Sequence, residues 1–250
     1  MPGTLYLVPN TLGSAPADQT GSLAHIIPGE VQALTASLTY FIAENAKTTR
    51  AFLKQVARAH TLAKPLQEIR IAELNVNTNA AALPALLAPI LAGEDGGLIS
   101  EAGVPAVADP GSDLVKMAHE LGIPVRPLVG PSSLLLALMA SGLHGQSFAF
   151  SGYLPTDAAL RIKRIKELED RSRRERQTQL FIETPYRNAA MLQALVSACQ
   201  PDTRVCVATD LTLPSESVRT LSAGKWKSLL SDGKMPDFHR KPTVFLLLAG

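Results

Sequence analysis

Cysteine and long apolar runs are scarce in this chain, and each scarcity excludes a class of protein. The two cysteines, Cys199 and Cys206, are too few for a disulfide framework or a structural zinc site, so we expect buried, reduced thiols. The apolar run at residues 134–140 is far shorter than the roughly 20 residues that a membrane span needs. No basic region followed by a long apolar stretch opens the chain, so we expect no signal peptide. These features predict a cytoplasmic protein that does not bind a membrane.

A strong excess of charge of one sign and the common catalytic motifs are also missing. A net charge of +2 is too small to indicate nucleic-acid binding by itself. The five histidines show no metal-ligand spacing and no Ser-His-Asp or Cys-His arrangement, so we expect no metal site. The glycine-containing stretch at residues 97–115 has neither the G-x-G-x-x-G spacing nor the lysine of a P-loop.

Apolar segments alternate between strand-like and helix-like patterns over the first half of the chain. Strands are predicted at residues 4–9, 39–44, 68–74, 96–100 and 125–129, and helices at 30–38, 49–59, 81–93 and 112–122. This alternation is typical of an α/β domain with a mainly parallel sheet.

The second half of the chain has a different order of elements. Strands are predicted at residues 147–155, 179–184, 204–211, 217–226 and 242–250, and helices at 161–176 and 188–199. The last three strands follow one another with little helix between them, which favours antiparallel pairing. We therefore predict two α/β domains, residues 1–128 and residues 129–250.

Residues 97–115 are rich in turn-forming residues, which follow the end of a predicted strand. Ligands bind beyond the carboxyl ends of strands in open α/β sheets, and residues 100–105 lie at such an end. Gly103 allows backbone to approach a ligand closely, and Asp109 begins a turn for which Ser112 is a plausible helix N-cap. The stretch is either a ligand-binding loop or a structural connection between strand and helix.

Residues 129–133 repeat this arrangement. A predicted strand ends at Val129, Gly130 and Pro131 form a turn, and Ser132 and Ser133 open a helix. A helix N-terminus offers free N–H groups to an anionic or polar ligand, although serine at this place also serves as a simple cap.

Five sequence blocks give the chain a resemblance to a known family. They are TLYLVPNTLG, GLISEAGVPAVADPGSDLV, VGPSSLLLAL, FSGYLP and LFIETPYRN. In this order the chain resembles the tetrapyrrole-methylase superfamily, and within it the branch that 2′-O-methylates a cytidine in small-subunit ribosomal RNA. The resemblance implies an α/β protein of two domains with a cofactor cleft between them, a homodimer, S-adenosylmethionine (SAM) as cofactor and RNA as partner.

The resemblance also implies cofactor-binding positions. They are Pro9, Ser100, Glu101, Ala102, Gly103, Gly130, Pro131, Ser132, Ser133, Leu154 and Glu183. A 2′-hydroxyl is a poor nucleophile that benefits from a general base. Glu44, Glu101 and Asp109 are the candidates by position, and the sequence does not choose among them.

Three segments depart from the pattern of the RNA-methylating branch. Residues 44–47 read Glu-Asn-Ala-Lys where that branch has Glu-Asp-Thr-Arg, and residues 73–79 contain no histidine where it has a His-x-His-Asn block. The first loop, residues 10–14, also differs from its usual Thr-Pro-x-Gly-Asn. Methylation is therefore better supported than the ribosomal target. A small-molecule methyltransferase and a catalytically silent SAM- or RNA-binding relative remain as alternatives.

A highly charged helix is predicted at residues 161–176. It has eight basic and four acidic residues, with Ile162, Ile165 and Leu168 on one apolar face. The basic face is either a solvated surface or a contact for RNA phosphates.

Overall fold

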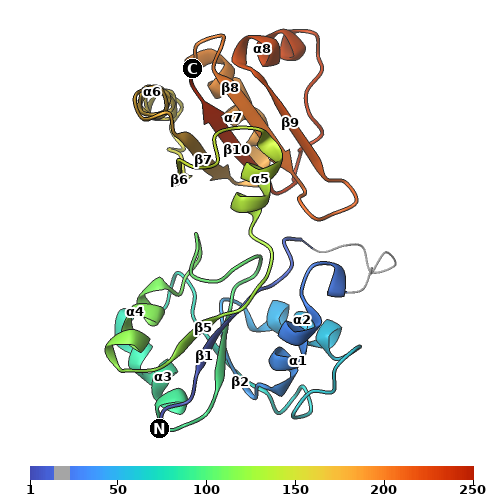
Figure 1. Ribbon diagram of the computed structural model, residues 1–250, viewed down its shortest axis with the longest axis vertical. Coiled ribbons are helices and arrows are strands. Elements are labelled where there is room, and N and C mark those ends of the chain that lie inside the picture. The colour runs from blue at the N-terminus through green and yellow to red at the C-terminus, as the bar shows by residue number, and fades with distance from the viewer. Residues whose placement is uncertain (14–22) are drawn as a thin grey trace. The chain divides into compact units, whose positions relative to one another are not determined.

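The computed structural model describes residues 1–13 and 23–250. The chain divides into two compact units, Met1–Ser132 (unit 1) and Ser133–Gly250 (unit 2) (Figure 1). Within the described residues, no helix combines the length and the apolar character that a membrane crossing requires. Ser14, the last residue of the first loop considered above, lies outside the described residues.

Unit 1 is built on a parallel sheet of five strands, as the alternating pattern predicted. The strands are β1 (Leu5–Val8), β2 (Tyr40–Ala43), β3 (Arg70–Glu73), β4 (Gly96–Ile99) and β5 (Val125–Pro127). Their order in the sheet is β3-β2-β4-β1-β5, and every pairing is parallel. All residues of β2 and β4 are buried, which explains why these strands are continuously apolar in sequence.

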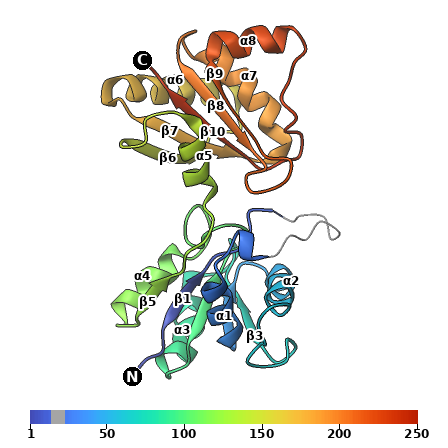
Figure 2. The same ribbon diagram turned by 45° about the vertical axis from the view of Figure 1, so that its right-hand side comes forward.

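Helices cover both faces of the unit 1 sheet (Figures 1 and 2). They are η1 (Leu23–His25), α1 (Gly29–Ser37), α2 (Ala46–Val56), η2 (Ala80–Ala82), α3 (Leu83–Leu91) and α4 (Ser112–Glu120). Phe41 of β2 packs in one core with α1 and α2, whereas its neighbour Ile42 packs in a second core with α3 and α4. Successive strand residues point to opposite faces, so the sheet is the middle of three layers.

Unit 2 contains a mixed sheet with the order β6-β7-β10-β8-β9. The strands are β6 (Phe148–Tyr153), β7 (Thr178–Glu183), β8 (Arg204–Thr209), β9 (Ser217–Ser222) and β10 (Thr243–Leu248). Among the described strands of unit 2, only β6 and β7 pair in parallel. Strand β10 pairs antiparallel with β7 and β8, and β8 pairs antiparallel with β9. The predicted antiparallel pairing of the last strands is confirmed.

The helices of unit 2 divide between the two faces of its sheet. They are α5 (Ser133–Ser141), α6 (Ala158–Glu175), η3 (Pro185–Arg187), α7 (Asn188–Ala198) and α8 (Ala223–Ser231). Helices α6, α7 and α8 share one core with Phe181, Val207 and Phe245 of the sheet. Helix α5 lies on the other face, where the Thr220 hydroxyl donates to the Ser141 carbonyl over 2.7 Å.

The predicted strand at residues 217–226 is wrong in its second half. Strand β9 ends at Ser222, whose side chain accepts a hydrogen bond from the Lys225 N–H over 3.3 Å and so caps α8. Trp226 is 1% exposed in this helix, and its Nε1 donates to the Val205 carbonyl over 2.9 Å. An N-cap and a buried tryptophan therefore override the strand-like composition of the segment.

Both cysteines are buried and free, as predicted. Burial raises the pKa of Cys199 to about 12 and also raises the pKa of Cys206. The thiols therefore remain protonated and unreactive at neutral pH.

Candidate functional site

Asn10 joins two strand ends at the carboxyl edge of the unit 1 sheet. It follows β1, is 5% exposed, and its Nδ2 donates to the carbonyls of Ser100 (3.1 Å) and Glu101 (3.0 Å) after β4. Its backbone N–H donates to the Gly103 carbonyl over 2.8 Å, and the Gly103 N–H donates to the Thr11 carbonyl over 3.2 Å. The loops after β1 and β4 are therefore one hydrogen-bonded structure, although they lie some ninety residues apart in sequence.

The loop after β5 reaches the same edge through two close approaches. A Cβ added to Gly130 would lie 2.1 Å from the Pro9 Cβ, a distance at which side chains collide. A Cβ added to Gly103 would lie 3.1 Å from the Leu12 side chain and 3.5 Å from the Pro131 carbonyl oxygen. Glycine at both positions lets the three strand-end loops approach closely, because a side chain at position 130 would collide with Pro9 and one at position 103 would crowd Leu12.

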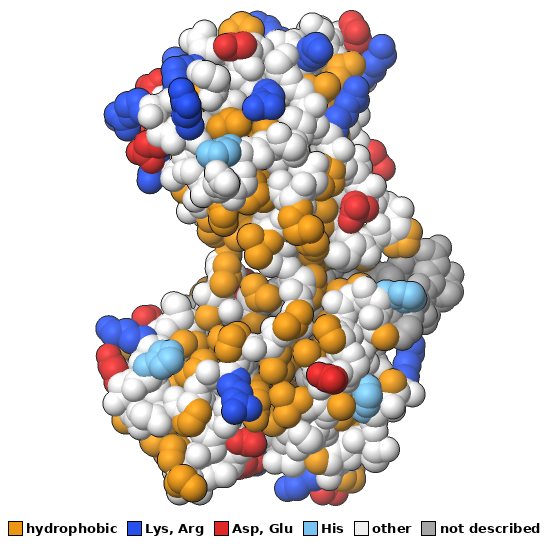
Figure 3. Space-filling view, viewed as in Figure 1, with side chains coloured by type: hydrophobic (Ala, Val, Ile, Leu, Met, Phe, Trp, Pro, Cys, Tyr) orange, Lys and Arg blue, Asp and Glu red, His pale blue; other side chains and the backbone are white. Residues whose placement is uncertain are grey.

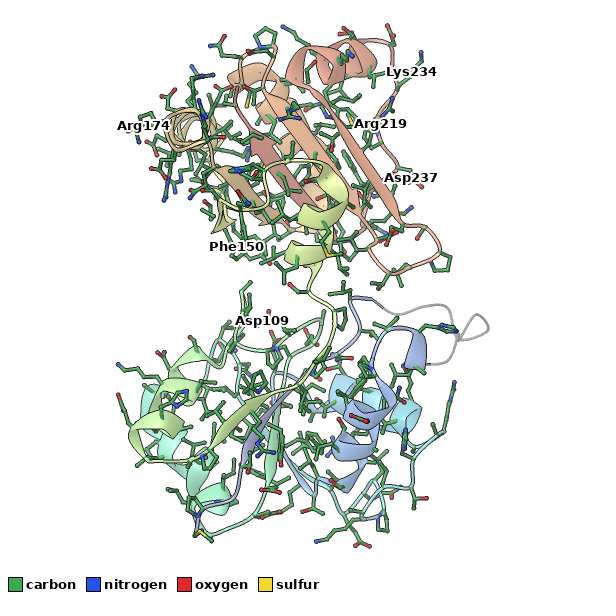
Figure 4. All side chains as sticks on the ribbon, in the orientation of Figure 1. Asp109, Phe150, Arg174, Arg219, Lys234 and Asp237 are labelled. Atoms are coloured by element: carbon green, nitrogen blue, oxygen red, sulfur yellow. The ribbon has the colours of Figure 1, made fainter. Side chains whose placement is uncertain are left out.

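Three carboxylates, all candidates from sequence, gather at this edge. The Glu44 Oε2, just after β2, accepts the Glu101 N–H over 3.1 Å. Asp109 (labelled in Figure 4) has its pKa raised from 3.8 to about 6, chiefly by burial and then by the negative charge of Glu44, with a smaller contribution from Glu101. The Ser100 hydroxyl opposes this shift by hydrogen bonding. The structure therefore brings all three carboxylates into one electrostatic cluster.

The loop between β4 and α4 holds an unusual backbone. Ala106 and Ala108 both have φ of +64°, which is uncommon for residues with a Cβ. Gly111 has φ of +132° and precedes α4 as its N-cap, without a side-chain hydrogen bond. The expectation that Ser112 caps this helix is wrong, because Ser112 is already its first helical residue. Strained loops of this kind concentrate at ligand sites.

The remaining predicted cofactor residues are distributed between the two units. In unit 1, Pro9 and Pro131 are buried and Ala102 is exposed beside Gly103. Ser132 is the last residue of unit 1, and Ser133 is the first residue of α5 in unit 2. Their binding roles stay predictions.

Leu154 and Glu183 lie in unit 2. Leu154 is 3% exposed and belongs to the core under α6 and α7. Glu183 ends β7, where its Oε1 accepts the Thr184 N–H over 2.7 Å and its Oε2 pairs with Arg187 over 2.6 Å. Both side chains have structural partners in their own unit, and a cofactor role for either stays a prediction.

The segments that depart from the resembled pattern have local structural roles. Asn45 caps α2 by accepting the N–H groups of Lys47 (2.9 Å) and Thr48 (3.4 Å). Asn75 accepts the Asn77 N–H, and Asn79 accepts the Ala81 N–H at the start of η2. Short polar side chains thus build caps and turns where the resembled branch has charged or histidine residues.

Sequence reasoning did not single out Asn10 as a site residue. The only local signal is a polar residue directly after a strand-ending proline. Its contacts with residues 100, 101 and 103 arise from tertiary structure, because β1 and β4 are neighbours in the sheet.

The four acidic residues of the charged helix α6 all pair with arginines of the same helix. Arg164 pairs with Glu167 over 3.1 Å, and Arg171 pairs with Glu175 over 3.1 Å. Arg173 lies 3.6 Å from Asp170 and 3.9 Å from the buried Glu169. Basic and acidic side chains lie side by side on this part of unit 2 (Figure 3). Several basic residues have no ion pair among the described residues, namely Lys163, Lys166, Arg174 and Arg176. The solvated face and the RNA contact therefore both stay predictions.

Metal ligands do not cluster in the part of the chain that the structure describes. No group of three or more His, Cys, Asp or Glu side chains could hold a metal ion there.

Two solved structures share the fold of this chain. The methyltransferase CobJ matches with a TM-score of 0.61 and 18% sequence identity, over 99% of this chain and 95% of that chain. Uroporphyrin-III-C-methyltransferase from Thermus thermophilus matches with a TM-score of 0.52 and 17% identity, over 99% and 93% of the respective chains. At these identities the likeness defines the fold, which is the one the sequence predicted.

The family follows from sequence. Residues 21–225 match the profile of the Tetrapyrrole (Corrin/Porphyrin) Methylases, and the chain belongs to this family. A ribosomal RNA small subunit methyltransferase I from Xylella fastidiosa is 31% identical over 87% of this chain and 71% of that protein. A protein of the same name from Mesorhizobium japonicum is 39% identical over 55% of this chain. The chain spans about half the length, 45%, of that relative.

Proposed function

We propose that this protein is a SAM-dependent methyltransferase that transfers a methyl group to a ribose 2′-hydroxyl of small-subunit ribosomal RNA. Family membership and the names of the Xylella and Mesorhizobium relatives support this activity. The observation that carries the proposal is the meeting of the loops after β1, β4 and β5 at the carboxyl edge of a parallel sheet. Ligands of open α/β sheets bind at this edge.

The residues at this edge fit SAM in charge. Gly103 and Gly130 allow the loops after β1, β4 and β5 to pack closely against one another, with the side chains of Leu12 and Pro9 against the two glycines. Glu44, Glu101 and Asp109 create a negative potential there. SAM is positively charged overall at neutral pH, whereas its demethylated product has lost the sulfonium charge. The cluster should therefore hold SAM more tightly than the product.

SAM supplies a methyl group activated by a positively charged sulfur. This chain must orient a ribose hydroxyl, exclude water and accept the hydroxyl proton. We assign proton acceptance to a carboxylate oxygen of Asp109. A pKa of about 6 leaves this carboxylate ionised at neutral pH and more basic than an ordinary aspartate. Glu44 is already engaged with the Glu101 N–H and so fixes the loop.

We also propose that the protein is a homodimer, as the resemblance to the family implies, and that it is cytoplasmic, as the sequence features predict. Sedimentation should find a species of twice the chain mass of 26.6 kDa. A mass near 26.6 kDa at every concentration tested would contradict the dimer.

Transfer of labelled methyl from SAM to purified small-subunit RNA tests the proposed function. RNA from a strain that lacks this protein should accept label, whereas RNA from the parent strain should not, because its target is already methylated. Label that enters a small-molecule fraction instead would indicate a metabolite methyltransferase. SAM binding without transfer to either fraction would indicate a catalytically silent relative.

A further inference from the structure

A pocket of about 420 Å³ with charged side chains in its lining opens in unit 2, on the sheet face beside α8. Its walls come from β8, β9, α8 and the segment at residues 234–241, and the volume is in the range of pockets that hold small organic groups. Register places Thr209 opposite Ser217 and Val207 opposite Arg219, so both strands contribute side chains to it. Three cations, Arg219, Lys234 and Lys241, line the pocket together with Asp237.

Arg219 is held in position with its hydrogen-bond donors free. Its guanidinium carbon lies 5.5 Å above the ring of Trp226, which is itself buried and hydrogen-bonded to Val205. No hydrogen bond of the guanidinium N–H groups to another described residue accompanies this cation–π contact, so these groups are available to a ligand. No carboxylate pairs with Arg219 among the residues described. Arg219 is therefore a preorganised cation in this pocket that has no carboxylate partner within the described part of the chain.

The charge that remains in the pocket is positive. Lys241 is engaged by Asp237 over 2.8 Å and by Asp210 over 3.6 Å, so Lys241 and the lining carboxylate neutralise each other. Lys234 is 68% exposed and has only a loose partner, Asp232, at 3.8 Å. Arg219 and Lys234 are therefore the two cations available to a ligand. Figure 4 shows Arg219, Lys234 and Asp237 along one edge of unit 2, away from Arg174 of α6.

An exposed aromatic side chain adjoins this pocket. Tyr186 of η3 is 72% exposed, and the guanidinium carbon of Arg240 lies 5.5 Å above its ring. Tyr186 lines a smaller hollow of about 120 Å³, and residues 235–237 form a wall of both hollows. Asn188 fixes this wall, because its Nδ2 donates to the carbonyls of Phe238 (2.8 Å) and Lys241 (2.9 Å).

Available cations near an exposed tyrosine, here an unpaired arginine and a loosely paired lysine, are the combination that binds single-stranded nucleic acid, through phosphates and stacked bases. We propose that this surface of unit 2 binds a single-stranded stretch of the RNA substrate, with a phosphodiester at Arg219 and Lys234 and a base stacked on Tyr186. The inference rests on the proposed function, because it takes RNA as the substrate. It places an RNA contact at the edge near β9, where Arg219 has no carboxylate partner among the described residues, whereas Arg171 and Arg173 of α6 pair with carboxylates of their own helix.

The test measures binding of a fluorescent oligouridylate to the full chain by anisotropy, at a series of salt concentrations. The double variant Arg219→Gln/Lys234→Gln should bind more weakly, and its slope of log affinity against log salt should be shallower by up to roughly 0.7 per lost contact. The matched control is Lys225→Gln/Lys227→Gln, which removes the same charge from exposed positions of α8 outside the pocket. An equal change in both double variants would overturn the proposal.

Single substitutions keep the test valid if the loss of the Arg219–Trp226 contact impairs folding. Lys234→Gln alone, at an exposed position, should still make the slope shallower by roughly 0.7. Tyr186→Ala should weaken oligouridylate binding roughly 5- to 150-fold, the range for one stacked base, whereas Tyr186→Phe should bind like the wild type. Unchanged binding in both Lys234→Gln and Tyr186→Ala would overturn the proposal.

Binding of a mononucleotide and methylation of RNA distinguish an RNA-binding surface from a pocket for a small phosphorylated molecule. If uridine monophosphate binding depends on Lys234 and oligouridylate binding does not, the pocket takes a small phosphorylated molecule and the proposal is wrong. If these variants bind and methylate RNA like the wild type, the proposed function stands and the site is wrong. If oligouridylate binding depends on the pocket and no methyl group reaches RNA, the binding site stands and the proposed function fails.

Discussion

Replacing Gly103 with alanine should weaken SAM binding, whereas the same change at Gly122 should not. Both glycines belong to unit 1 and have nearly the same left-handed backbone, with φ of +68° and +69°. At Gly103 the new Cβ would lie 3.1 Å from the Leu12 side chain and 3.5 Å from the Pro131 carbonyl oxygen, whereas nothing lies within 4 Å at Gly122. The backbone cost is thus common to both variants, and only Gly103→Ala disturbs the meeting loops.

The loss of stability that Gly103→Ala and Gly122→Ala share can be estimated from their left-handed backbone. An L residue in the left-handed region costs roughly 1–2 kcal/mol, which corresponds to a melting temperature lower by roughly 2–8 °C for a chain of this size. Calorimetry should then find weaker SAM binding in Gly103→Ala and normal binding in Gly122→Ala. The β-branched Gly103→Val should weaken binding further. A folded Gly103→Val protein with unchanged SAM affinity would refute the placement of the cofactor at this loop.

Three other outcomes are expected. SAM affinity should fall as pH drops through about 6, because Asp109 has a pKa of about 6 and its protonation removes its attraction for the positively charged ligand. Calorimetry on Asp109→Asn should find weak SAM binding without this pH dependence. The double variant Arg171→Gln/Arg173→Gln should leave RNA affinity and the slope of log affinity against log salt unchanged, because both arginines pair with carboxylates of α6. A shallower slope in this variant would indicate that α6 is an RNA surface. Asn188→Ala should destabilise unit 2 by about 1–3 kcal/mol, because its side chain holds two buried carbonyls; chemical denaturation measures the loss, and an unchanged midpoint would contradict it.

The local pattern of apolar residues along the sequence was sufficient to predict that unit 1 is an α/β domain with a parallel sheet. Strands β2 and β4 are buried along their whole length, so their apolar runs are uninterrupted in sequence. Helix α2 has buried residues at helical spacing, namely Thr49, Phe52, Leu53 and Val56. These signals depend on neighbours within a few positions along the chain, which is why one sequence reveals them.

Contacts between distant segments escaped the same reasoning. The hydrogen bonds of Asn10 with residues 100 and 101 depend on β1 and β4 lying side by side. The raised pKa of Asp109 depends on the neighbouring Glu44, which lies on another loop. The pocket beside α8 was missed for a related reason, because its walls come from four separate elements and one of them, α8, was expected to be a strand.

The chemical position of the transferred methyl group tests the central claim most directly. RNA labelled by this protein and SAM should be hydrolysed in alkali, which cleaves every linkage that has a free 2′-hydroxyl. Methylation of a ribose 2′-oxygen protects the following linkage, so the label should appear in an alkali-resistant dinucleotide. Label in mononucleotides would place the methyl group on a base, and the absence of label from RNA would contradict RNA methylation altogether.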